Sequence, residues 1–471
     1  MISIDFYNDK KNLMQIVSDS DELELIRHHF SCPNPAAISR NKFIPKRLYA
    51  ITPAGKFESG LLEEIKKYLI SENLRFEISE DIKNSKIVFN ASEIVPMHIP
   101  YREYQENAIV TAIRENNGVI VVGTGGGKTL LTAGLIVNLR ENLKKLNAKV
   151  LVTVPTIQLV EQTASDFKEY GLTKISKWSG KNKLDADAEI IVAGTQYLVG
   201  KNTDLSILND IDILIMDECH VLKKNNEINN IFKFIKTPFK FGLTGSLPEE
   251  KIDQWNINGK LGPIIFEKKT DELKKGEYVS DFQIYLIEID HGKTNFPFNP
   301  NSPTSKYENE LTYLMTCEKR NDIISKLVNK INKNTIIMVD RILHGEELLN
   351  SLKKICIDSP VYFIQGSTEM EDREKIKNLM ENESNVIVVA ISKIFSTGIN
   401  IPNLHSIVFA SAGKAKIKIV QSIGRALRLH PTKEKAYIFD IADNTYYGKI
   451  HKDERKKLYK AEKYPFIEKN I

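Results

Sequence analysis

The chain has 471 residues, of which 42% are hydrophobic, and is long enough for roughly three domains of about 150 residues each with more than one buried core. Its net charge of +5 permits an anionic partner, and its four cysteines stand singly without metal-ligand spacing, which argues against a disulfide framework or a structural zinc site. The N-terminus lacks a basic stretch followed by an apolar one, and apolar runs such as 386–391 are too short to span a membrane, so we expect a protein of the reducing cytoplasm.

Residues 1–95 are expected to form a small α+β accessory domain. Alternating apolar residues at positions 2, 4 and 6 predict a strand, and apolar residues at helical spacing over 61–69 predict a helix. Within the segment SRNKFIPKRLYAI at 39–51, basic residues alternate with aromatic and aliphatic ones, a mixture suited to nucleic-acid phosphates. These basic residues are Arg40, Lys42, Lys46 and Arg47. The alternative is a domain that only stabilises the rest of the chain.

The remainder of the chain predicts two α/β lobes. Short apolar runs such as GVIVV, AKVLVTV and DILIMDE alternate with helical patterns over 105–245, which is typical of a parallel sheet covered on both faces. The same rhythm returns in NTIIMVD, SNVIVVA and KAYIFDI. We place the first lobe at 96–290, a connector rich in Asn, Pro and Ser at 291–316, the second lobe at 317–445 and a basic tail at 446–471.

The segment VVGTGGGKTL at 121–130 predicts a phosphate-binding loop between a strand and a helix. Its glycines allow backbone N–H groups to converge on a phosphate at the positive end of the helix. The predicted nucleotide contacts are Gly123, Thr124, Gly125, Gly126, Gly127, Lys128 and Thr129. Lys128 would neutralise the β- and γ-phosphates, and Thr129 would offer a hydroxyl to Mg²⁺. Val122 stands where the strict GxxxxGK[ST] pattern has its first glycine.

The segment IDILIMDECH at 211–220 predicts a buried strand with two carboxylates at its carboxyl end, where ligands bind in open α/β sheets. Asp217 would hold Mg²⁺, and Glu218 would orient and deprotonate the attacking water. Such a strand end alone is commonplace, but together with the phosphate loop it indicates a nucleotide hydrolase.

With these two motifs the chain resembles the superfamily 2 helicases of the DExH type. The motifs of that family follow one another in the expected order over residues 102–428. REYQ at 102–105 resembles the adenine-recognition element, with Gln105 in that role. VPTIQLVEQ at 154–162 and AGTQYL at 193–198 resemble motifs that contact the strand. LTGSL at 243–247 resembles motif III, with Gly245 in place of the commoner alanine. The resemblance implies that Thr244, Ser246 and His220 couple the ATP site to the nucleic-acid track.

The later motifs follow in the second lobe as FIQGST at 363–368, FSTGINIP at 395–402 and QSIGRALR at 421–428. Arg425 and Arg428 are three residues apart, hence on one helix face, and could reach the γ-phosphate as arginine fingers. Gln421 would help to position the nucleotide or the attacking water. In isolation, two arginines at this spacing are more often part of a surface salt-bridge face.

The family resemblance also indicates how the chain would bind nucleic acid. ATP would close the two RecA-like lobes and hydrolysis would release them, so that each cycle shifts their grip on a strand. Backbone amides and hydroxyls are suitable donors to phosphates, although each threonine could instead be an ordinary cap residue. The expected contacts are Thr156, Thr195, Gly366, Ser367 and Thr397.

The architecture further resembles the UvsW-like bacteriophage branch-migration helicases, through a small basic N-terminal domain and the segments VDRILHGEELLNSLK and FSTGINIPNLHSIVFA. This resemblance implies an ATP- and Mg²⁺-dependent enzyme that remodels branched DNA, such as forks and Holliday junctions, in recombination, replication and repair. It would act in the cytoplasm, the host cytoplasm if the chain is viral.

Three alternatives remain open at this point. DExH motors also act on RNA, so an RNA helicase has to be considered. A translocase subunit of a restriction system would normally bring a nuclease motif, and we find none in the sequence. The third alternative is a scaffold whose nucleic-acid binding is regulated by ATP and which unwinds nothing.

Overall fold

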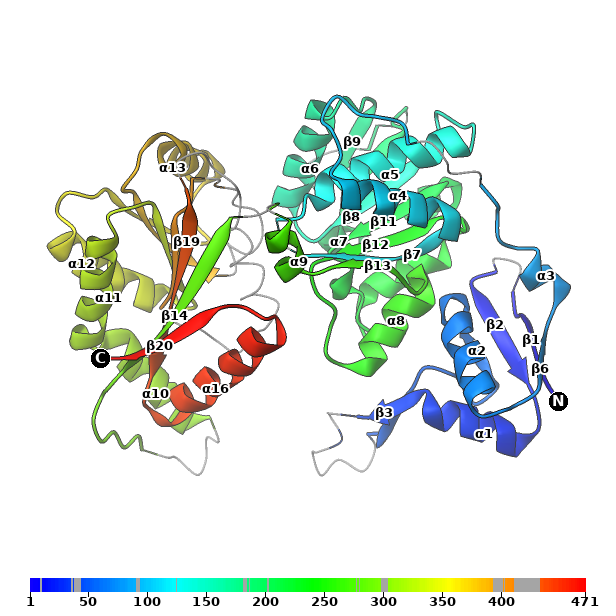
Figure 1. Ribbon diagram of the computed structural model, residues 1–471, viewed down its shortest axis with the longest axis horizontal. Coiled ribbons are helices and arrows are strands. Elements are labelled where there is room, and N and C mark those ends of the chain that lie inside the picture. The colour runs from blue at the N-terminus through cyan, green and yellow to red at the C-terminus, as the bar shows by residue number, and fades with distance from the viewer. Residues whose placement is uncertain are drawn as a thin grey trace. The chain divides into compact units, whose positions relative to one another are not determined.

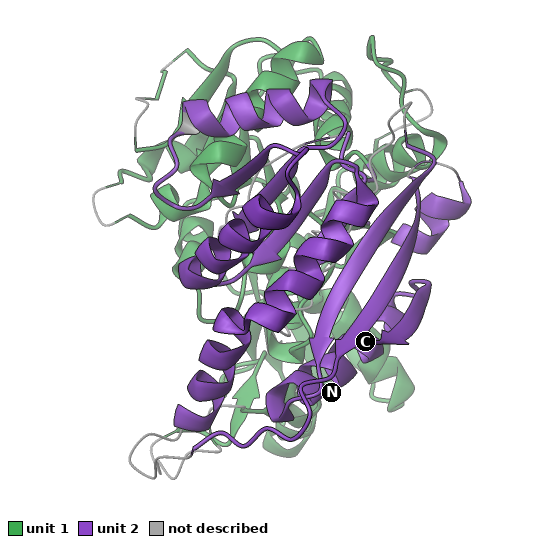
Figure 2. Cartoon of the chain, turned by 90° about the vertical axis from the view of Figure 1, so that its left-hand side faces the viewer, with its two compact units in different colours: residues 1–122, 127–268 green, residues 123–126, 269–471 purple. Residues whose placement is uncertain are grey.

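A computed structural model provides the fold. It describes residues 1–8, 11–34, 37, 44–89, 94–123, 125–180, 184–185, 187–200, 203–276, 278, 280–297, 304–392, 401, 403–410 and 433–471. These residues form two compact units, one of residues 1–122 and 127–268 and one of residues 123–126 and 269–471 (Figure 2). Among the described helices, none is both long and apolar enough to cross a membrane.

The N-terminal domain is a small sheet with helices, as its sequence predicts (Figure 1). The sheet order is β5-β2-β1-β6, and β1 runs antiparallel to β2 and parallel to β6. Ile2 and Ile4 on β1 and Ile16 on β2 are buried, which follows the alternation in the sequence. Its elements are β1 (Ile2–Phe6), β2 (Leu13–Val17), α1 (Ser20–His29), β3 (Ser31–Pro33), β4 (Arg47–Tyr49), β5 (Lys56–Glu58), α2 (Leu62–Ser71), β6 (Phe76–Ile78) and α3 (Glu80–Lys83).

The first lobe contains a seven-stranded parallel sheet in the order β13-β7-β12-β11-β8-β10-β9. Every residue of β8 and β10 is buried, as expected for strands covered on both faces. The strands are β7 (Asn117–Val122), β8 (Val150–Val154), β9 (Ile175–Trp178), β10 (Ile190–Gly194), β11 (Ile213–Asp217), β12 (Lys240–Thr244) and β13 (Ile264–Lys268). The helices are α4 (Glu103–Glu115), α5 (Lys128–Asn142), α6 (Ile157–Glu169), α7 (Thr195–Leu198) and α8 (Lys251–Leu261).

Helix α8 attaches the N-terminal domain to the first lobe. Trp255 and Ile252 on this helix are buried within the hydrophobic core of the N-terminal domain. The Trp255 indole N–H donates to Glu64 Oε1 at 2.8 Å, and Lys260 pairs with Glu58 at 2.5 Å. Shared apolar burial together with these polar contacts makes the two parts one packed unit.

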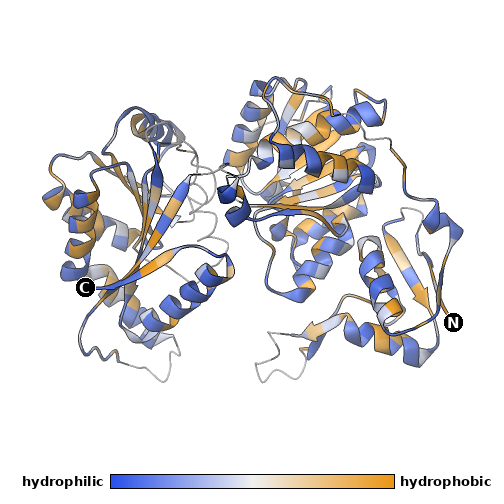
Figure 3. Cartoon of the chain, in the orientation of Figure 1, coloured by the Kyte–Doolittle hydropathy of each residue, from blue (hydrophilic) through white to orange (hydrophobic). Residues whose placement is uncertain are grey.

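The second unit contains another seven-stranded parallel sheet, in the order β16-β17-β15-β18-β19-β14-β20. The two parallel sheets and the small N-terminal domain confirm the predicted fold class, and Figure 3 shows apolar residues concentrated along the strands. The strands are β14 (Asp281–Ile289), β15 (Thr335–Val339), β16 (Val361–Ile364), β17 (Ile387–Ile391), β18 (Ser406–Phe409), β19 (Lys435–Asp443) and β20 (Phe466–Asn470). The helices are α9 (Thr270–Lys275), α10 (Ser305–Thr316), α11 (Glu318–Ile331), α12 (Ile342–Ile355), α13 (Met370–Asn382) and α16 (Tyr446–Ala461).

The ends of the second unit differ from the sequence expectation. Strand β14 lies in the second sheet because it pairs with β19 and β20, although residues up to 290 were expected in the first lobe. Residues 305–316 of the expected connector form α10, and the expected basic tail forms α16 and β20. These assignments depend on strand pairing between distant segments, which local periodicity does not reveal.

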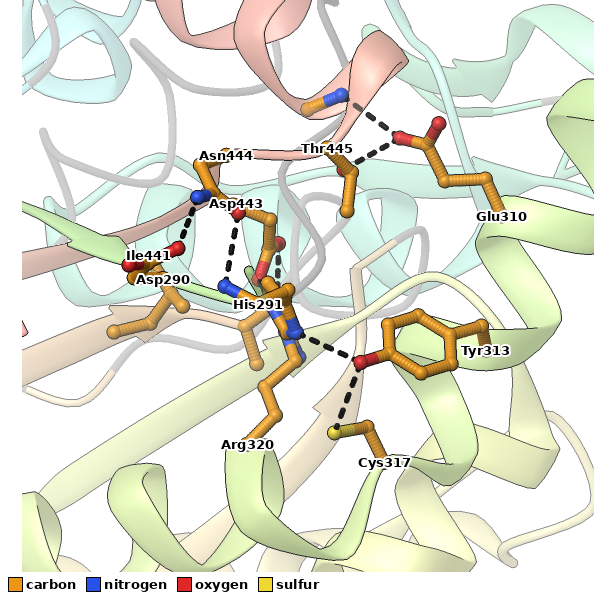
Figure 4. A network of polar contacts seen from close by, with 12 residues as sticks. Asp290, His291, Glu310, Tyr313, Cys317, Arg320, Ile441, Asp443, Asn444 and Thr445 are labelled. Carbon is orange, nitrogen blue, oxygen red and sulfur yellow. Dashed lines mark hydrogen bonds and ion pairs between the residues drawn. The ribbon is translucent and has the colours of Figure 1, made fainter. Parts of the chain in front are cut away.

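A buried polar network links α10, α11, β19 and α16 of the second unit (Figure 4). Arg320 on α11 donates to both carboxylate oxygens of Asp443 at the end of β19, at 2.8 and 3.1 Å, and His291 lies 2.9 Å from the same carboxylate. Burial would raise the pKa of Asp443, but the charge of Arg320 and the hydrogen bonds from His291 and Arg320 hold that pKa well below its ordinary value. Glu310 on α10 accepts hydrogen bonds from Thr445 Oγ1 and from backbone N–H groups in the first turn of α16.

We expect Arg320→Met to lower the free energy of unfolding of the second unit by about 3 to 5 kcal/mol, because it leaves the Asp443 carboxylate buried without its cation. Hydrogen exchange followed by mass spectrometry should then show faster exchange in β14, β15 and β19 and unchanged exchange in β8 and β10. Lys375→Met, which removes an exposed ion pair with Asp372, is the matched control and should change stability by less than about 0.5 kcal/mol. Unchanged protection of β19 in Arg320→Met would contradict this role for the network.

Candidate nucleotide-binding site

The glycine loop has the geometry of a phosphate cradle. Strand β7 ends at Val122, and α5 begins at Lys128 with Gly127 as its N-cap. Gly125 and Gly127 have positive φ angles of 84° and 71°, which side-chain-bearing residues rarely adopt. The turn is closed by a hydrogen bond of 3.0 Å from Gly126 N to Gly123 O. The first N–H groups of α5 are therefore available to an anion at the positive end of the helix.

Gln105 on α4 holds the end of this loop through hydrogen bonds of its side-chain amide. Its side chain is 1% exposed, its amide Nε2 donates to Gly127 O at 3.2 Å, and its Oε1 accepts from Arg102 N at 2.9 Å. A Cβ atom at Gly127 would lie 2.8 Å from the same amide nitrogen. In this structure Gln105 therefore holds the loop in place, and its predicted contact with adenine stays a prediction.

The acidic pair lies at the same edge of the sheet as the loop. Asp217 is the last residue of β11, and Glu218 follows it in a left-handed backbone conformation with φ of 50°. Glu218 Oε1 lies 3.5 Å from Lys128 Nζ, and both side chains are largely buried. Lys128 at the start of α5 and Glu218 after β11 thus come together at one edge of the sheet.

The electrostatics of the two acids differ. Burial and the neighbouring Glu218 raise the pKa of Asp217 to about 6. Burial would also raise the pKa of Glu218, but the charge of Lys128 and the hydrogen bond and charge of His220 together lower it to about 2. Glu218 is therefore ionised at neutral pH and engaged by Lys128.

The residues with a predicted coupling role form a chain of contacts that starts at Glu218. His220 Nδ1 lies 3.1 Å from Glu218 Oε2 and 3.2 Å from Thr244 Oγ1 at the end of β12. Thr244 is fully buried, and its hydroxyl donates to Ser246 O at 2.8 Å. The contacts connect the acid that faces Lys128 to the segment after β12.

These residues fit a magnesium nucleotide. Thr129 lies in the first turn of α5, and Asp217 offers a carboxylate at the same edge of the sheet. Over the described ranges, no group of three or more His, Cys, Asp or Glu could hold a metal ion on its own. Mg²⁺ is commonly held by one or two protein oxygens together with substrate phosphates, so a small protein ligand set is appropriate.

Two of the predicted nucleic-acid contacts in the first lobe lie side by side. Thr156 caps α6 and accepts from Leu159 N at 3.4 Å, while the Thr195 hydroxyl donates to Pro155 O at 3.3 Å. They follow β8 and β10, which are neighbouring strands. Both hydroxyls thus have local structural partners, and phosphate contact by these residues stays a prediction.

The predicted contacts in the second unit lie on the loop after β16. A Cβ atom at Gly366 would have no neighbour within 4 Å, and Ser367 is exposed. Arg373 on α13 donates to the carbonyl oxygens of Gln365 and Gly366, both at 3.1 Å. The sequence does not predict these two hydrogen bonds, because nothing in a charged helix indicates which residues its arginine contacts.

The basic strand of the N-terminal domain is only partly available. Arg47 donates from Nε to Ser31 Oγ at 2.8 Å and from Nη2 to Ser31 O at 3.1 Å, so its guanidinium links β4 to β3. Lys46 is exposed. Arg47 therefore has a structural role, which its sequence context did not reveal.

Several predicted residues lie outside the described part of the chain. They are Arg40, Lys42, Thr124, Thr397, Gln421, Arg425 and Arg428. The predicted contact of the arginine pair with the γ-phosphate therefore stays a prediction.

Comparisons with known proteins agree with this geometry. Residues 98–249 match the family model described as "Type III restriction enzyme, res subunit", and residues 318–430 match the "Helicase conserved C-terminal domain". The fold is similar to a Vibrio vulnificus fragment assigned as the HsdR subunit of a type I restriction enzyme, with a TM-score of 0.61 and 16% identity over 90% of this chain and 84% of that one.

The curated relatives include helicases. The ATP-dependent DNA helicase UvsW of Enterobacteria phage T4 is 30% identical over 352 residues, which cover 72% of this chain and 68% of that protein. The XPB helicase/translocase subunit of the general transcription and DNA repair factor IIH from Dictyostelium discoideum is 24% identical, over 86% of this chain and 51% of that protein.

The two parallel-sheet lobes, the phosphate cradle and the acidic pair define an ATP-dependent helicase of superfamily 2. Within this class, the chain belongs to the family of the phage T4 DNA helicase UvsW. Membership of a DNA helicase family favours DNA over the alternative of RNA.

We expect Gln105→Leu to weaken ATP binding about fivefold to tenfold, because Gly127 O and Arg102 N each lose a buried hydrogen bond. Titration with a fluorescent ATP analogue measures this change. Asn107→Ala, an exposed change on the same helix, should leave the affinity as it is. Wild-type affinity in Gln105→Leu would show that the loop keeps its shape without this support.

Proposed function

We propose that this helicase uses ATP hydrolysis to remodel branched DNA, by migration of Holliday junctions and by regression or unwinding of forks, in recombination, replication and repair. The observation that supports the hydrolytic site is the 3.5 Å approach of Lys128 Nζ to Glu218 Oε1. A DNA substrate is supported by the relation to the phage T4 DNA helicase, and its branched form by the resemblance of the sequence to the branch-migration helicases. Four free cysteine thiols fit action in a reducing cytoplasm, that of a host cell if the chain is viral.

The ion pair between Lys128 and Glu218 indicates how nucleotide binding prepares the site. Lys128 would leave Glu218 to contact the β- and γ-phosphates, so the cation that lowers the pKa of Glu218 would move away. Glu218 would then be a stronger base and free to accept a proton from the attacking water. Mg²⁺, held by Thr129 and Asp217, would neutralise charge on the phosphates.

The contacts from Glu218 through His220 to Thr244 and Ser246 would carry the change outward. When Glu218 gains a new partner, His220 loses one of its two contacts and the segment after β12 can shift. Thr156 and Thr195, at the ends of neighbouring strands of the same sheet, would then change their contact with the DNA backbone. In the second lobe, Arg425 and Arg428 would contact the γ-phosphate and Gln421 would position the nucleotide or the attacking water. Thr397 would contact the DNA backbone.

A panel of single-stranded, duplex, forked and four-way DNA together with structured RNA tests the substrate. We expect the strongest stimulation of ATP hydrolysis by forked and four-way DNA, because binding of several arms releases more counterions than binding of one strand. Equal or greater stimulation by RNA would reject branched DNA as the substrate.

Two variants separate hydrolysis from binding in this test. Glu218→Gln should retain ATP binding and reduce hydrolysis by a factor of about 10² to 10⁴, the usual contribution of a general base. Lys128→Ala should lose both. Junction migration that survives either loss would reject the motor mechanism.

We expect Thr244→Val to hydrolyse ATP within about threefold of the wild-type rate and to migrate junctions at least about tenfold more slowly. The change keeps the volume of the side chain but removes the hydroxyl that contacts His220 and Ser246. Measurement of both rates on one four-way junction gives the ratio of ATP consumed to distance moved. Thr111→Val on α4, whose hydroxyl bonds only within its own helix, is the matched control. A parallel fall of both rates would place Thr244 in hydrolysis itself.

A further inference from the structure

A groove of about 920 Å³ runs between the N-terminal domain and the first lobe. Phe6, Met14 and Ile82 line it on the side of the N-terminal domain, while Asn117 at the start of β7 and Pro263 just before β13 line it on the other side. Because the strands are parallel, this is the edge of the sheet opposite to the phosphate loop. We call it the N-terminal groove.

The lining of the N-terminal groove is strongly basic. The carboxylates in it are Glu63 and Glu115, which pair with Lys66 at 2.8 Å and with Lys86 at 2.7 Å. Lys83 also pairs with Glu80, beside the groove, at 2.7 Å, so six lysines against these three glutamates leave a surplus of three positive charges. The six are Lys11, Lys66, Lys83, Lys86, Lys236 and Lys240. Such a concentration of one sign attracts an anionic polymer.

Lys240 gives an independent indication that the groove binds an anion. It is the first residue of β12 and is 8% exposed, yet within the described ranges it makes no ion pair and no side-chain hydrogen bond. Glu58, whose charge acts on it, is already bound by Lys260 at 2.5 Å. Burial accordingly lowers the pKa of Lys240 to about 8. Most of the side chain is buried while Lys240 lines the groove, so an anion in the groove would supply the counterion that this largely desolvated charge favours.

The two walls of the groove are held in place. The core shared through Trp255 and Ile252 and the close approach of Gly60 to the backbone of α8, where a Cβ would lie 2.1 Å from Asn258 O, leave little room for sliding. The packing of the first unit therefore fixes the shape of the groove.

We propose that the N-terminal groove binds the phosphodiester backbone of a single DNA strand, which comes from a second arm of the branched substrate. This inference rests on the proposed function. The lysines supply phosphate contacts, and the partly exposed ring of Phe6 supplies a surface for a base. Strands of five to six residues at about 3.3 Å per residue place the two edges of the sheet roughly 16 to 20 Å apart. A strand on Thr156 and Thr195 at the carboxyl ends of the strands would have to pass the full height of the sheet to enter the groove, whereas a second arm of a branch can enter it directly.

The test is a charge reversal in the groove with a matched control. Lys83→Glu with Lys236→Glu changes one exposed lysine in each wall. Lys67→Glu with Lys168→Glu changes one exposed lysine in each part of the same unit outside the groove. Binding of a fork with two single-stranded arms and of a single strand of equal length is measured without ATP at several salt concentrations. Circular dichroism checks that both variants are folded.

We expect the groove variant to lose about tenfold in affinity for the fork, and the slope of log K against log salt to fall by about 1.4, since each lost single-strand phosphate contact is worth roughly 0.7. Affinity for the single strand and its stimulation of ATP hydrolysis should change less than about twofold. The control variant should behave as wild type. A photo-crosslinker at Lys236→Cys should label one arm of the fork.

Three results would overturn the inference. Equal losses for fork and single strand would make the groove part of the general DNA track. Unchanged affinity for the fork would remove DNA from the groove. The same unchanged affinity, with loss of binding to poly-glutamate, would assign the groove to an acidic protein segment instead. Because binding is measured without ATP, failure of junction migration in the wild-type protein would reject the proposed function and leave this measurement readable.

Discussion

The site depends on one geometric constraint, the parallel direction of the strands in the first lobe. Parallel strands bring their carboxyl ends to one edge, so segments far apart in the chain meet there. Lys128 follows β7 and Glu218 follows β11, and their side chains approach to 3.5 Å. If either strand were reversed, the cation and the carboxylate would lie at opposite edges of the sheet.

The order of the strands decides which residues can act as intermediaries. Strand β12 lies between β7 and β11, so Thr244 at its end stands beside both motifs and contacts His220. Burial makes each of these contacts selective, because a buried polar group without a partner is costly. A change of partner at Glu218 therefore alters the hydrogen bonds of His220 and Thr244. Exposed side chains would instead exchange their partners for water.

The opposite edge of the same sheet has a different character. There the N-terminal domain is attached through the apolar face around Trp255 and through polar contacts to Glu64 and Glu58. The sheet thus separates a nucleotide-binding edge from a lysine-rich edge, and its rigid strands keep the two at a constant distance.

Local pattern in the sequence determined the strands and the loop. VLVTV at 150–154 is apolar throughout, which predicts a strand buried on both faces of a parallel sheet, and the glycines before Lys128 permit the positive φ angles of a tight turn into a helix. Tertiary structure alone decided that Arg47 bonds to Ser31, that Gln105 supports the loop, that Arg320 meets Asp443, and that residues 446–471 complete the second sheet. A single basic or amide side chain has many possible partners in the sequence, and only the pairing of distant segments brings one of them within a hydrogen bond.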